Sequence, residues 1–326
     1  MPYIEDNLPY KVPYLIYVDP TNLCNFKCNF CPTGNKFLLK DINRPAGFMT
    51  MEIFDKFVGD LKKMIKKYNQ KPDSILLFKD GEPLLNPNLI SMIKAVKENN
   101  LTDLLHITSN ASKLNQDISR RLITSGLDQI RFSIYGVDDE SYKQNGNIVK
   151  FESIYNNIKE FWEINKEHNF PIEVVCKIID NYPDDQINEF KKKFEKICSR
   201  LHIEKFHNWS DTKNWEIKNK DSYPNLNSNF EEDFLCAQPF SRLTVLFNGE
   251  VTPCCVDWSH KLVVGNIKND SLDYIWNNLA NKIRQEHIQN SFKKDSPCIN
   301  CDYKVTRSKY DKIYNKEKKL NLMFNS

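Results

Sequence analysis

Cysteine is the residue type of this sequence best suited to chemistry, and eight of its ten cysteines fall in two groups near the two ends of the chain. The N-terminus shows no export signal, so we expect a cytoplasmic protein whose cysteines stay reduced. In that compartment clustered thiols are typical of metal ligands or catalytic groups rather than of disulfides. The cysteines are Cys24, Cys28, Cys31, Cys176, Cys198, Cys236, Cys254, Cys255, Cys298 and Cys301.

The first group, Cys24-x3-Cys28-x2-Cys31, predicts a metal site with incomplete protein ligation. A structural zinc site takes four ligands, but no fourth cysteine lies nearby and the nearest histidine is His106. An iron–sulfur cluster held by three thiolates keeps one iron open, as catalysis requires. A zinc site with a distant fourth ligand and a set of unliganded thiols are the alternatives.

Alternating strands and helices must position these cysteines. Six strand patterns alternate with five helix patterns, which is typical of parallel βαβ units with functional groups at the carboxyl ends of the strands. Six units are too few to close an eight-stranded barrel, so we predict an α/β fold with a partial, TIM-like (β/α)6 barrel. The predicted strands are 14–19, 74–78, 104–109, 129–133, 172–179 and 201–206, and the predicted helices are 50–67, 89–97, 115–125, 151–165 and 184–198.

The composition divides the chain into three regions. Residues 1–206 form the barrel, 207–235 a polar linker or lid, and 236–326 a small α+β domain with a hairpin turn at Asn248-Gly249 and a helix near 271–287. The 46 basic and 43 acidic residues leave a net charge of +3, and the pI of 8.2 lies below that of a typical nucleic-acid-binding domain. No apolar run is long enough to span a membrane. We therefore predict neither a nucleic-acid nor a membrane partner.

The first cysteine group resembles the signature of the radical S-adenosylmethionine (SAM) superfamily, C-x3-C-x2-C on the loop after the first strand. The resemblance implies that Cys24, Cys28 and Cys31 hold a [4Fe–4S] cluster whose open iron chelates the amino and carboxylate groups of SAM. One electron then cleaves SAM to methionine and a 5′-deoxyadenosyl radical, which abstracts a substrate hydrogen. A one-electron reductant such as flavodoxin is also implied, and Phe30 is expected beside the adenine.

Later strand ends match further SAM-binding features of this family. The run Lys79-Asp80-Gly81-Glu82-Pro83 is similar to the G-G-E-P motif, in which the glutamate holds the methionyl amino group. Gly81 permits a close backbone approach and Glu82 can accept hydrogen bonds from an ammonium. Asp80 differs from the motif, because it stands where the motif has its first glycine. The other implied cofactor contacts are Ser109, Asn110, Ser133 and the backbone of Val175.

The second cysteine group resembles the shortened, "twitch" form of the SPASM domain that follows many radical SAM barrels. The matching features are Cys236-x12-Gly249-x4-Cys254 and the later pair Cys298-x2-Cys301. Four thiolates close a site, and their spacing alone leaves zinc and iron–sulfur open. The resemblance implies one auxiliary [4Fe–4S] cluster that relays electrons or stabilises the fold. The neighbouring Cys255 is then expected to be a packed thiol.

The resemblance implies an oxidoreductase. We expect it to oxidise a small polar metabolite, a sugar or an aminocyclitol alcohol, and to pass an electron to the auxiliary cluster. Only 13 residues precede the first predicted strand, which favours a small molecule. Peptide or protein side-chain modification is the alternative, and a non-catalytic iron–sulfur or zinc module is a third reading. The predicted catalytic residues are Tyr135, Lys177 and the base Asp257, and the further substrate candidates are Lys79, Asp80, His207 and Trp209.

Overall fold

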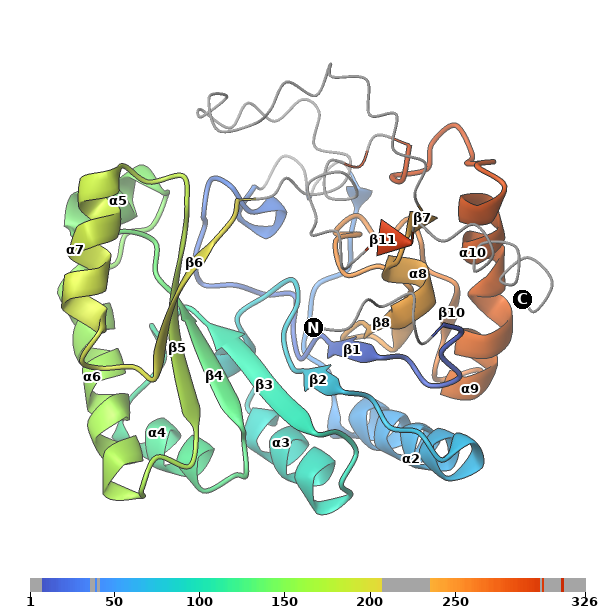
Figure 1. Ribbon diagram of the computed structural model, residues 1–326, viewed down its shortest axis with the longest axis horizontal. Coiled ribbons are helices and arrows are strands. Elements are labelled where there is room, and N and C mark those ends of the chain that lie inside the picture. The colour runs from blue at the N-terminus through green and yellow to red at the C-terminus, as the bar shows by residue number, and fades with distance from the viewer. Residues whose placement is uncertain are drawn as a thin grey trace.

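A parallel sheet forms the centre of the computed structural model, which describes residues 8–35, 39, 42–206, 235–299, 301, 312 and 313. Six strands lie side by side in chain order and all run parallel, which confirms the predicted α/β fold with a partial barrel (Figure 1). The strands are β1 (Leu15–Val18), β2 (Ser74–Leu76), β3 (Leu104–Ser109), β4 (Gln129–Ser133), β5 (Glu173–Ile179) and β6 (Arg200–Glu204).

The two faces of this sheet differ because successive side chains of a strand point to opposite sides. On β3, Leu105 and Ile107 belong to the hydrophobic core, while His106 and Thr108 alternate with them and face the inside of the barrel. Helices cover the core face. These helices are α2 (Met51–Tyr68), α3 (Leu89–Glu98), α4 (Gln116–Ile123), α5 (Asp139–Gln144), α6 (Phe151–Glu167) and α7 (Asp184–Phe194).

Local sequence explains where these helices begin. The Thr50 side chain caps α2 by accepting from the amide of Ile53 at 3.4 Å, and Asn69 ends the helix in a left-handed conformation. The short helix α5 was not predicted, because its sequence is polar and lacks an apolar stripe. A capping box between Asp138 and Ser141 starts it instead.

The C-terminal region extends the barrel sheet. Strand β8 pairs in parallel with β1, with Tyr17 opposite Thr244, and Trp276 lies in the same hydrophobic core as the barrel helices. The predicted division at 206 and 236 stays a prediction, since the sheet and the core continue across it. The elements of this region are β7 (Leu235–Cys236), α8 (Gln238–Ser241), β8 (Arg242–Val245), β9 (Glu250–Thr252), β10 (Gly265–Asn266), α9 (Leu272–Tyr274), α10 (Asn281–Ile288) and β11 (Lys312–Ile313).

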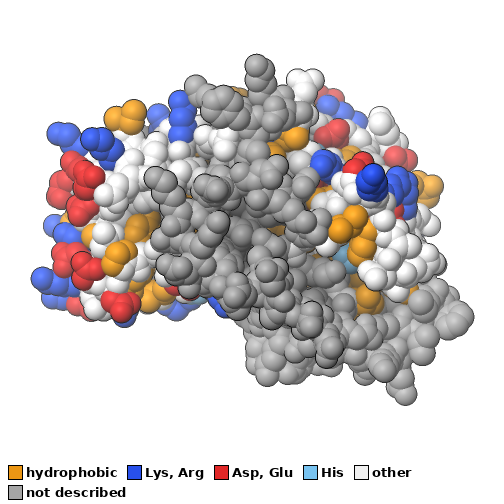
Figure 2. Space-filling model, turned by 90° about the horizontal axis from the view of Figure 1, so that it is seen from above, with side chains coloured by type: hydrophobic (Ala, Val, Ile, Leu, Met, Phe, Trp, Pro, Cys, Tyr) orange, Lys and Arg blue, Asp and Glu red, His pale blue; other side chains and the backbone are white. Residues whose placement is uncertain are grey.

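The helix expected near 271–287 is not one regular helix. It begins as α9, passes through a π-helical segment at Ile275–Leu279 and continues as α10. The predicted linker or lid lies outside the described residues, apart from Leu235, as do His207 and Trp209. Among the described helices, none combines the length and apolarity needed to cross a membrane. Figure 2 shows basic and acidic side chains interspersed over the visible part of the described surface.

A buried carboxylate on α2 attaches the C-terminal region to the barrel. Asp60 accepts from the amide of Leu272, the first residue of α9, at 3.1 Å and forms ion pairs with Lys56 and Lys63. At the end of α2, Lys67 lies 2.7 Å from the carboxylate of Asp273. The start of α9 therefore packs against α2 through polar contacts.

Replacing Asp60 with alanine tests this attachment. The variant leaves the buried amide of Leu272 without its acceptor, so we expect the free energy of unfolding to fall by about 1–3 kcal/mol. Urea unfolding of oxygen-free protein measures the change. Asp55→Ala removes an exposed acid from the same helix and should change this energy by less than about 0.5 kcal/mol. Equal losses in the two variants would contradict the assignment.

Candidate functional site

Three cysteine side chains gather on the loop after β1, at the carboxyl edge of the parallel sheet. Cys28 is buried, and Cys24 and Cys31 are half-buried. Burial raises the pKa of Cys24 to about 12 and the pKa values of Cys28 and Cys31 above the ordinary range. Repulsion from Cys31 adds to the increase at Cys24, and repulsion from Cys31 and Cys24 adds to the increase at Cys28, as expected for neighbouring side chains. Thiolates at this site need a positive group bound to them.

The surroundings of these thiols fit an iron–sulfur cluster. The amide of Phe26 donates to the sulfur of Cys24 at 3.4 Å, and the side-chain amide of Asn147 donates to that of Cys28 at 3.3 Å. Hydrogen bonds of this kind stabilise cluster sulfurs. Within the described residues, no three cysteine, histidine or carboxylate side chains converge tightly enough to hold a single metal ion. A [4Fe–4S] cluster binds each thiolate at a different iron, so its ligands stand further apart than those of one ion.

A glycine fixes the cysteine loop against the next strand end. A Cβ atom at Gly81 would lie 2.2 Å from the carbonyl oxygen of Thr21 and 2.4 Å from that of Leu23. The amide of Glu82 donates to the same carbonyl of Leu23 at 2.9 Å. Gly81 therefore makes a close backbone approach to the loop that carries Cys24, and its predicted contact with SAM stays a prediction.

The structure brings the predicted residues Glu82, Ser109 and Asn110 together in one group. The buried carboxylate of Glu82 accepts from the Ser109 hydroxyl at 2.8 Å and from the backbone amide of Asn110 at 2.7 Å. It also accepts from the amide of Leu84 at 3.0 Å. Burial raises the pKa of Glu82 to about 7, and the amides of Asn110 and Leu84 oppose this increase. The carboxylate is close enough to Cys24 to influence its pKa.

Aromatic side chains line one side of the cysteine loop. The ring of Tyr135 lies 5.8 Å from that of Phe30 and 5.6 Å from that of Phe26, between ring centroids. The pKa of Tyr135 is raised well above its ordinary value by burial and then by Cys28 and Cys24. Tyr135 thus lies beside the cysteines, at the cofactor end of the site. The predicted contact of Phe30 with adenine stays a prediction.

The other predicted barrel residues lie on β4 and β5. Ser133 is buried at the carboxyl end of β4, opposite Lys177 of β5. Val175 is buried but lies outside the hydrophobic core that contains its neighbours Val174 and Cys176. The amino group of Lys177 pairs with the carboxylate of Glu204 at 2.6 Å.

The seven cysteines outside the first group have different kinds of surroundings. Cys176 and Cys198 lie together in the core, as expected for structural thiols. The four predicted auxiliary ligands are electrostatic neighbours: Cys298 and Cys301 influence Cys254, and Cys236 and Cys301 influence Cys298. Burial raises the pKa of Cys298 to about 12. The thiol of Cys255 donates to the side chain of Gln238 at 3.4 Å, which supports its predicted packing role.

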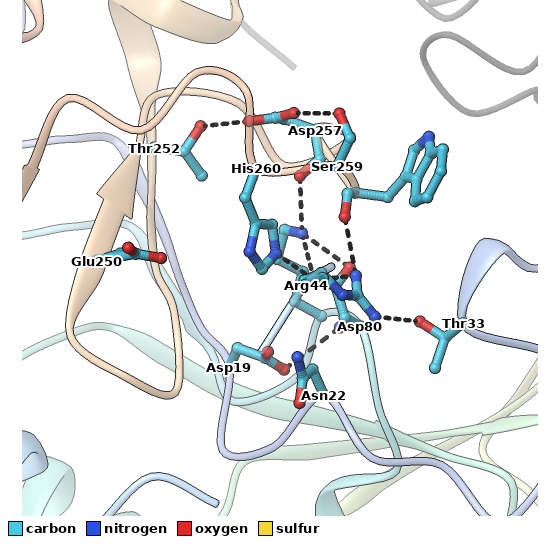
Figure 3. Close-up of polar contacts among 12 residues, drawn as sticks. Asp19, Asn22, Thr33, Arg44, Asp80, Glu250, Thr252, Asp257, Ser259 and His260 are labelled. Atoms are coloured by element: carbon cyan, nitrogen blue, oxygen red, sulfur yellow. Dashed lines mark hydrogen bonds and ion pairs between the residues drawn. The ribbon is translucent and has the colours of Figure 1, made fainter. Parts of the chain in front are cut away.

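The carboxylate of Asp257 forms hydrogen bonds with residues of the surrounding loop. It accepts from the amide of Leu262 at 2.8 Å and from that of Lys261 at 3.1 Å. The hydroxyls of Thr252 and Ser259 donate to it at 3.3 Å (Figure 3). The side chain is fully buried. These contacts describe a loop-stabilising residue, and its role as substrate base stays a prediction.

Asp80 occupies the position of the family's first glycine and forms the centre of a buried charge network. Its carboxylate lies 2.7 Å from the amino group of Lys79, 3.2 Å from the guanidinium of Arg44 and 3.0 Å from Nε2 of His260 (Figure 3). Burial acts to raise the pKa of Asp80, but these neighbours, Lys79 above all, hold it below its ordinary value. Burial and the charge of Asp80 raise the pKa of the adjacent Asp19 to about 7.

This network joins the two cysteine regions. Arg44 donates to the hydroxyl of Thr33, two residues after Cys31, at 3.1 Å and to the main-chain carbonyl of Trp258 at 2.9 Å. Lys79 donates to the carbonyl of Asp257 at 3.3 Å. No sequence signal pointed to Arg44, Asn147 or His260, because their partners lie more than 100 residues away in most cases. The departure at Asp80 was the one visible sign of the network.

Comparisons with known proteins agree with this geometry. A curated GTP 3′,8-cyclase of Pasteurella multocida is 21% identical over 178 residues, covering 54% of this chain and 48% of that protein. The chain thus spans about half the length of this curated relative. The structure of BtrN in complex with AdoMet and 2-DOIA matches with a TM-score of 0.54 and 19% identity, covering 89% of this chain and 92% of that one.

A second solved structure shows the same fold. Streptococcus suis SuiB bound to precursor peptide SuiA matches with a TM-score of 0.61 and 17% identity, over 96% of this chain and 76% of that one. The model of the radical SAM superfamily matches residues 18–197, and that of the SPASM iron–sulfur cluster-binding domain matches 236–302. The chain therefore belongs to the radical SAM superfamily and carries a C-terminal SPASM domain.

Proposed function

We propose that this radical SAM enzyme oxidises an alcohol of a small polar metabolite, a sugar or an aminocyclitol. The two domains imply a [4Fe–4S] cluster that binds SAM and an auxiliary iron–sulfur cluster. In this proposal Cys24, Cys28 and Cys31 hold the first cluster, and the auxiliary ligands are Cys236, Cys254, Cys298 and Cys301. Bound SAM supplies a 5′-deoxyadenosyl radical after one-electron reduction.

The observation that carries the proposal is the short connection between the two cysteine regions. Arg44 contacts Thr33 beside the first group and Trp258 beside the second, at 3.1 and 2.9 Å. An electron acceptor must lie near the reacting carbon if it is to take an electron from a substrate radical. In this proposal four cysteines would ligate every iron of the auxiliary cluster, which would then suit electron transfer rather than substrate binding.

The atoms and electrons of the proposed oxidation balance. The hydrogen atom on the alcohol carbon passes to the 5′-deoxyadenosyl radical and gives 5′-deoxyadenosine. The hydroxyl proton would leave to a base, and an auxiliary cluster held by the second cysteine group would accept one electron, which would leave a carbonyl group. A one-electron reductant of the flavodoxin type supplies the electron that cleaves SAM. We retain Asp257, Tyr135 and Lys177 as the proposed substrate-contacting residues.

Peptide modification is the second candidate function, because SuiB, a structural neighbour, was solved with a precursor peptide. We favour a small molecule because the inside of the barrel carries charged and polar side chains close together, including Arg131, Lys177 and Glu204. Such a lining suits a compact polar substrate.

Anaerobic reconstitution tests the enzyme proposal. Two clusters predict about eight irons per chain, together with SAM cleavage upon reduction. Bound zinc without SAM cleavage would instead support the non-catalytic module. Formation of a ketone or aldehyde from a polyol library would support the proposed alcohol oxidation. Side-chain modification in a peptide library would contradict it and support peptide modification instead.

The close approach at Gly81 predicts the effect of a single methyl group. In Gly81→Ala, the new methyl group would clash with the backbone carbonyls of Thr21 and Leu23 on the cysteine loop. We therefore expect the first cluster to be lost and the iron content to fall from about eight to about four per chain. Gly59→Ala is a matched control because a Cβ there has nothing within 4 Å. Iron analysis of both variants is the measurement, and equal iron contents would contradict the prediction.

The pKa of Glu82 predicts how SAM binding depends on pH. Its pKa is about 7 in the SAM-free protein, and the ionised carboxylate binds the methionyl amino group much more strongly than the neutral acid does. The SAM affinity of wild type relative to Glu82→Gln should therefore rise about tenfold from pH 6 to pH 8. The ratio removes the titration of SAM itself, which both proteins share. Calorimetric titration at each pH gives the ratio, and a constant ratio would show that Glu82 does not hold the amino group.

A further inference from the structure

Arg131 carries an unbalanced positive charge on the inner face of the barrel. Its neighbours on β4, Ile130 and Phe132, belong to the hydrophobic core, so Arg131 points to the opposite side. The nearby acids already have cationic partners: Glu204 pairs with Lys177 at 2.6 Å and Glu173 with Arg200 at 3.2 Å. Among the described residues, no carboxylate forms an ion pair with Arg131.

One hydrogen bond orients the guanidinium of Arg131. Its Nε donates to the side-chain oxygen of Gln129 at 2.7 Å, and the amide of Gln129 donates in turn to Glu173. Within the described part of the chain, its two terminal nitrogens have no hydrogen-bond acceptor. The fork of two N–H groups that binds carboxylates and phosphates with two parallel hydrogen bonds is therefore held in place and unused.

The adjacent strand adds two polar groups that also lack partners. Thr108 lies opposite Arg131 in the register of β3 and β4, which are neighbours in the sheet (Figure 1). Among the described residues, no hydrogen-bond partner exists for its buried hydroxyl or for either ring nitrogen of the buried His106. Burial, then Arg131 and Lys177, lower the pKa of His106 to about 3, so its ring is neutral and can donate one hydrogen bond. Buried polar groups of this kind are normally satisfied, so a ligand at this position would complete them.

We propose that Arg131, His106 and Thr108 form an oxyanion site that binds a phosphate or carboxylate group of the substrate. The inference rests on the proposed function and narrows its substrate class to an anionic polar metabolite. Arg131 lies two residues before Ser133 on β4, and about 7 Å of strand separates them. The anionic group would thus lie deeper in the barrel than the predicted cofactor contact at Ser133, with the rest of the substrate extending toward the carboxyl edge.

Titration of the reconstituted protein with inorganic phosphate and with acetate, at constant ionic strength, tests this site. We expect Arg131→Gln to weaken the binding of whichever anion the wild type prefers by at least about tenfold. Arg120→Gln is the matched control, since it removes the same charge from an exposed position on α4 and should leave the affinity within about twofold. Equal affinities of the two variants would overturn the proposal.

Two further measurements separate a loss of the site from misfolding and from SAM binding. Arg131→Lys retains the charge but not the fork, so it should bind the anion with an affinity between those of wild type and Arg131→Gln, even if the glutamine variant folds poorly. The carboxylate of SAM is the other possible anion at Arg131. Phosphate or acetate should bind equally well to SAM-free and SAM-loaded protein, and loss of this binding on SAM addition would assign Arg131 to SAM and overturn the proposal.

The proposed function and the oxyanion site can fail separately. A wild type that cleaves SAM but binds neither anion through Arg131 would overturn the site alone. Anion binding that depends on Arg131, in a protein that leaves SAM intact, would uphold the site and overturn the proposed function.

Discussion

The contact between Gly81 and the cysteine loop is the constraint on which the rest of the site depends. A Cβ atom would lie 2.2 Å from a backbone oxygen, so no other residue fits without displacing the chain. The contact fixes the loop that carries Cys24 against the end of β2. The following residue, Glu82, is then placed beside the cysteines and held by Ser109 and Asn110 from the next strand. The close backbone contact at Gly81 thus fixes the positions of both the cysteine loop and the carboxylate proposed to hold SAM.

The substitution of aspartate for the family's first glycine has a physical explanation. The side chain of Asp80 points into a buried network with Arg44, Lys79 and His260. Burying one carboxylate is costly unless charged and hydrogen-bonding partners surround it. Arg44 and Lys79 supply positive charge from the barrel, and Nε2 of His260, from the C-terminal region, lies 3.0 Å away. Removing the aspartate would leave Arg44 and Lys79 without this buried counter-charge. The residue therefore links the barrel with the C-terminal region, a role that a glycine could not have.

The barrel was predictable from sequence because its strands are short apolar runs followed by helices with an apolar stripe. The bounds of β3 and β4 agree with the predicted ranges, and both cysteine groups could be recognised from spacing alone. Contacts between distant segments were not predictable. The pairing of β8 with β1 and the hydrogen bond from Asn147 to Cys28 join segments more than 100 residues apart. Neither leaves a local pattern, because only the folded chain brings these groups together.

We propose that three cysteines leave one iron of a cluster open for SAM. Mössbauer spectroscopy of iron-57-labelled, oxygen-free protein tests it most directly. We expect that adding SAM changes the signal of about one iron in eight and leaves the others unaffected. A spectrum in which SAM changes no iron, because a fourth protein ligand completes the first cluster, would contradict it.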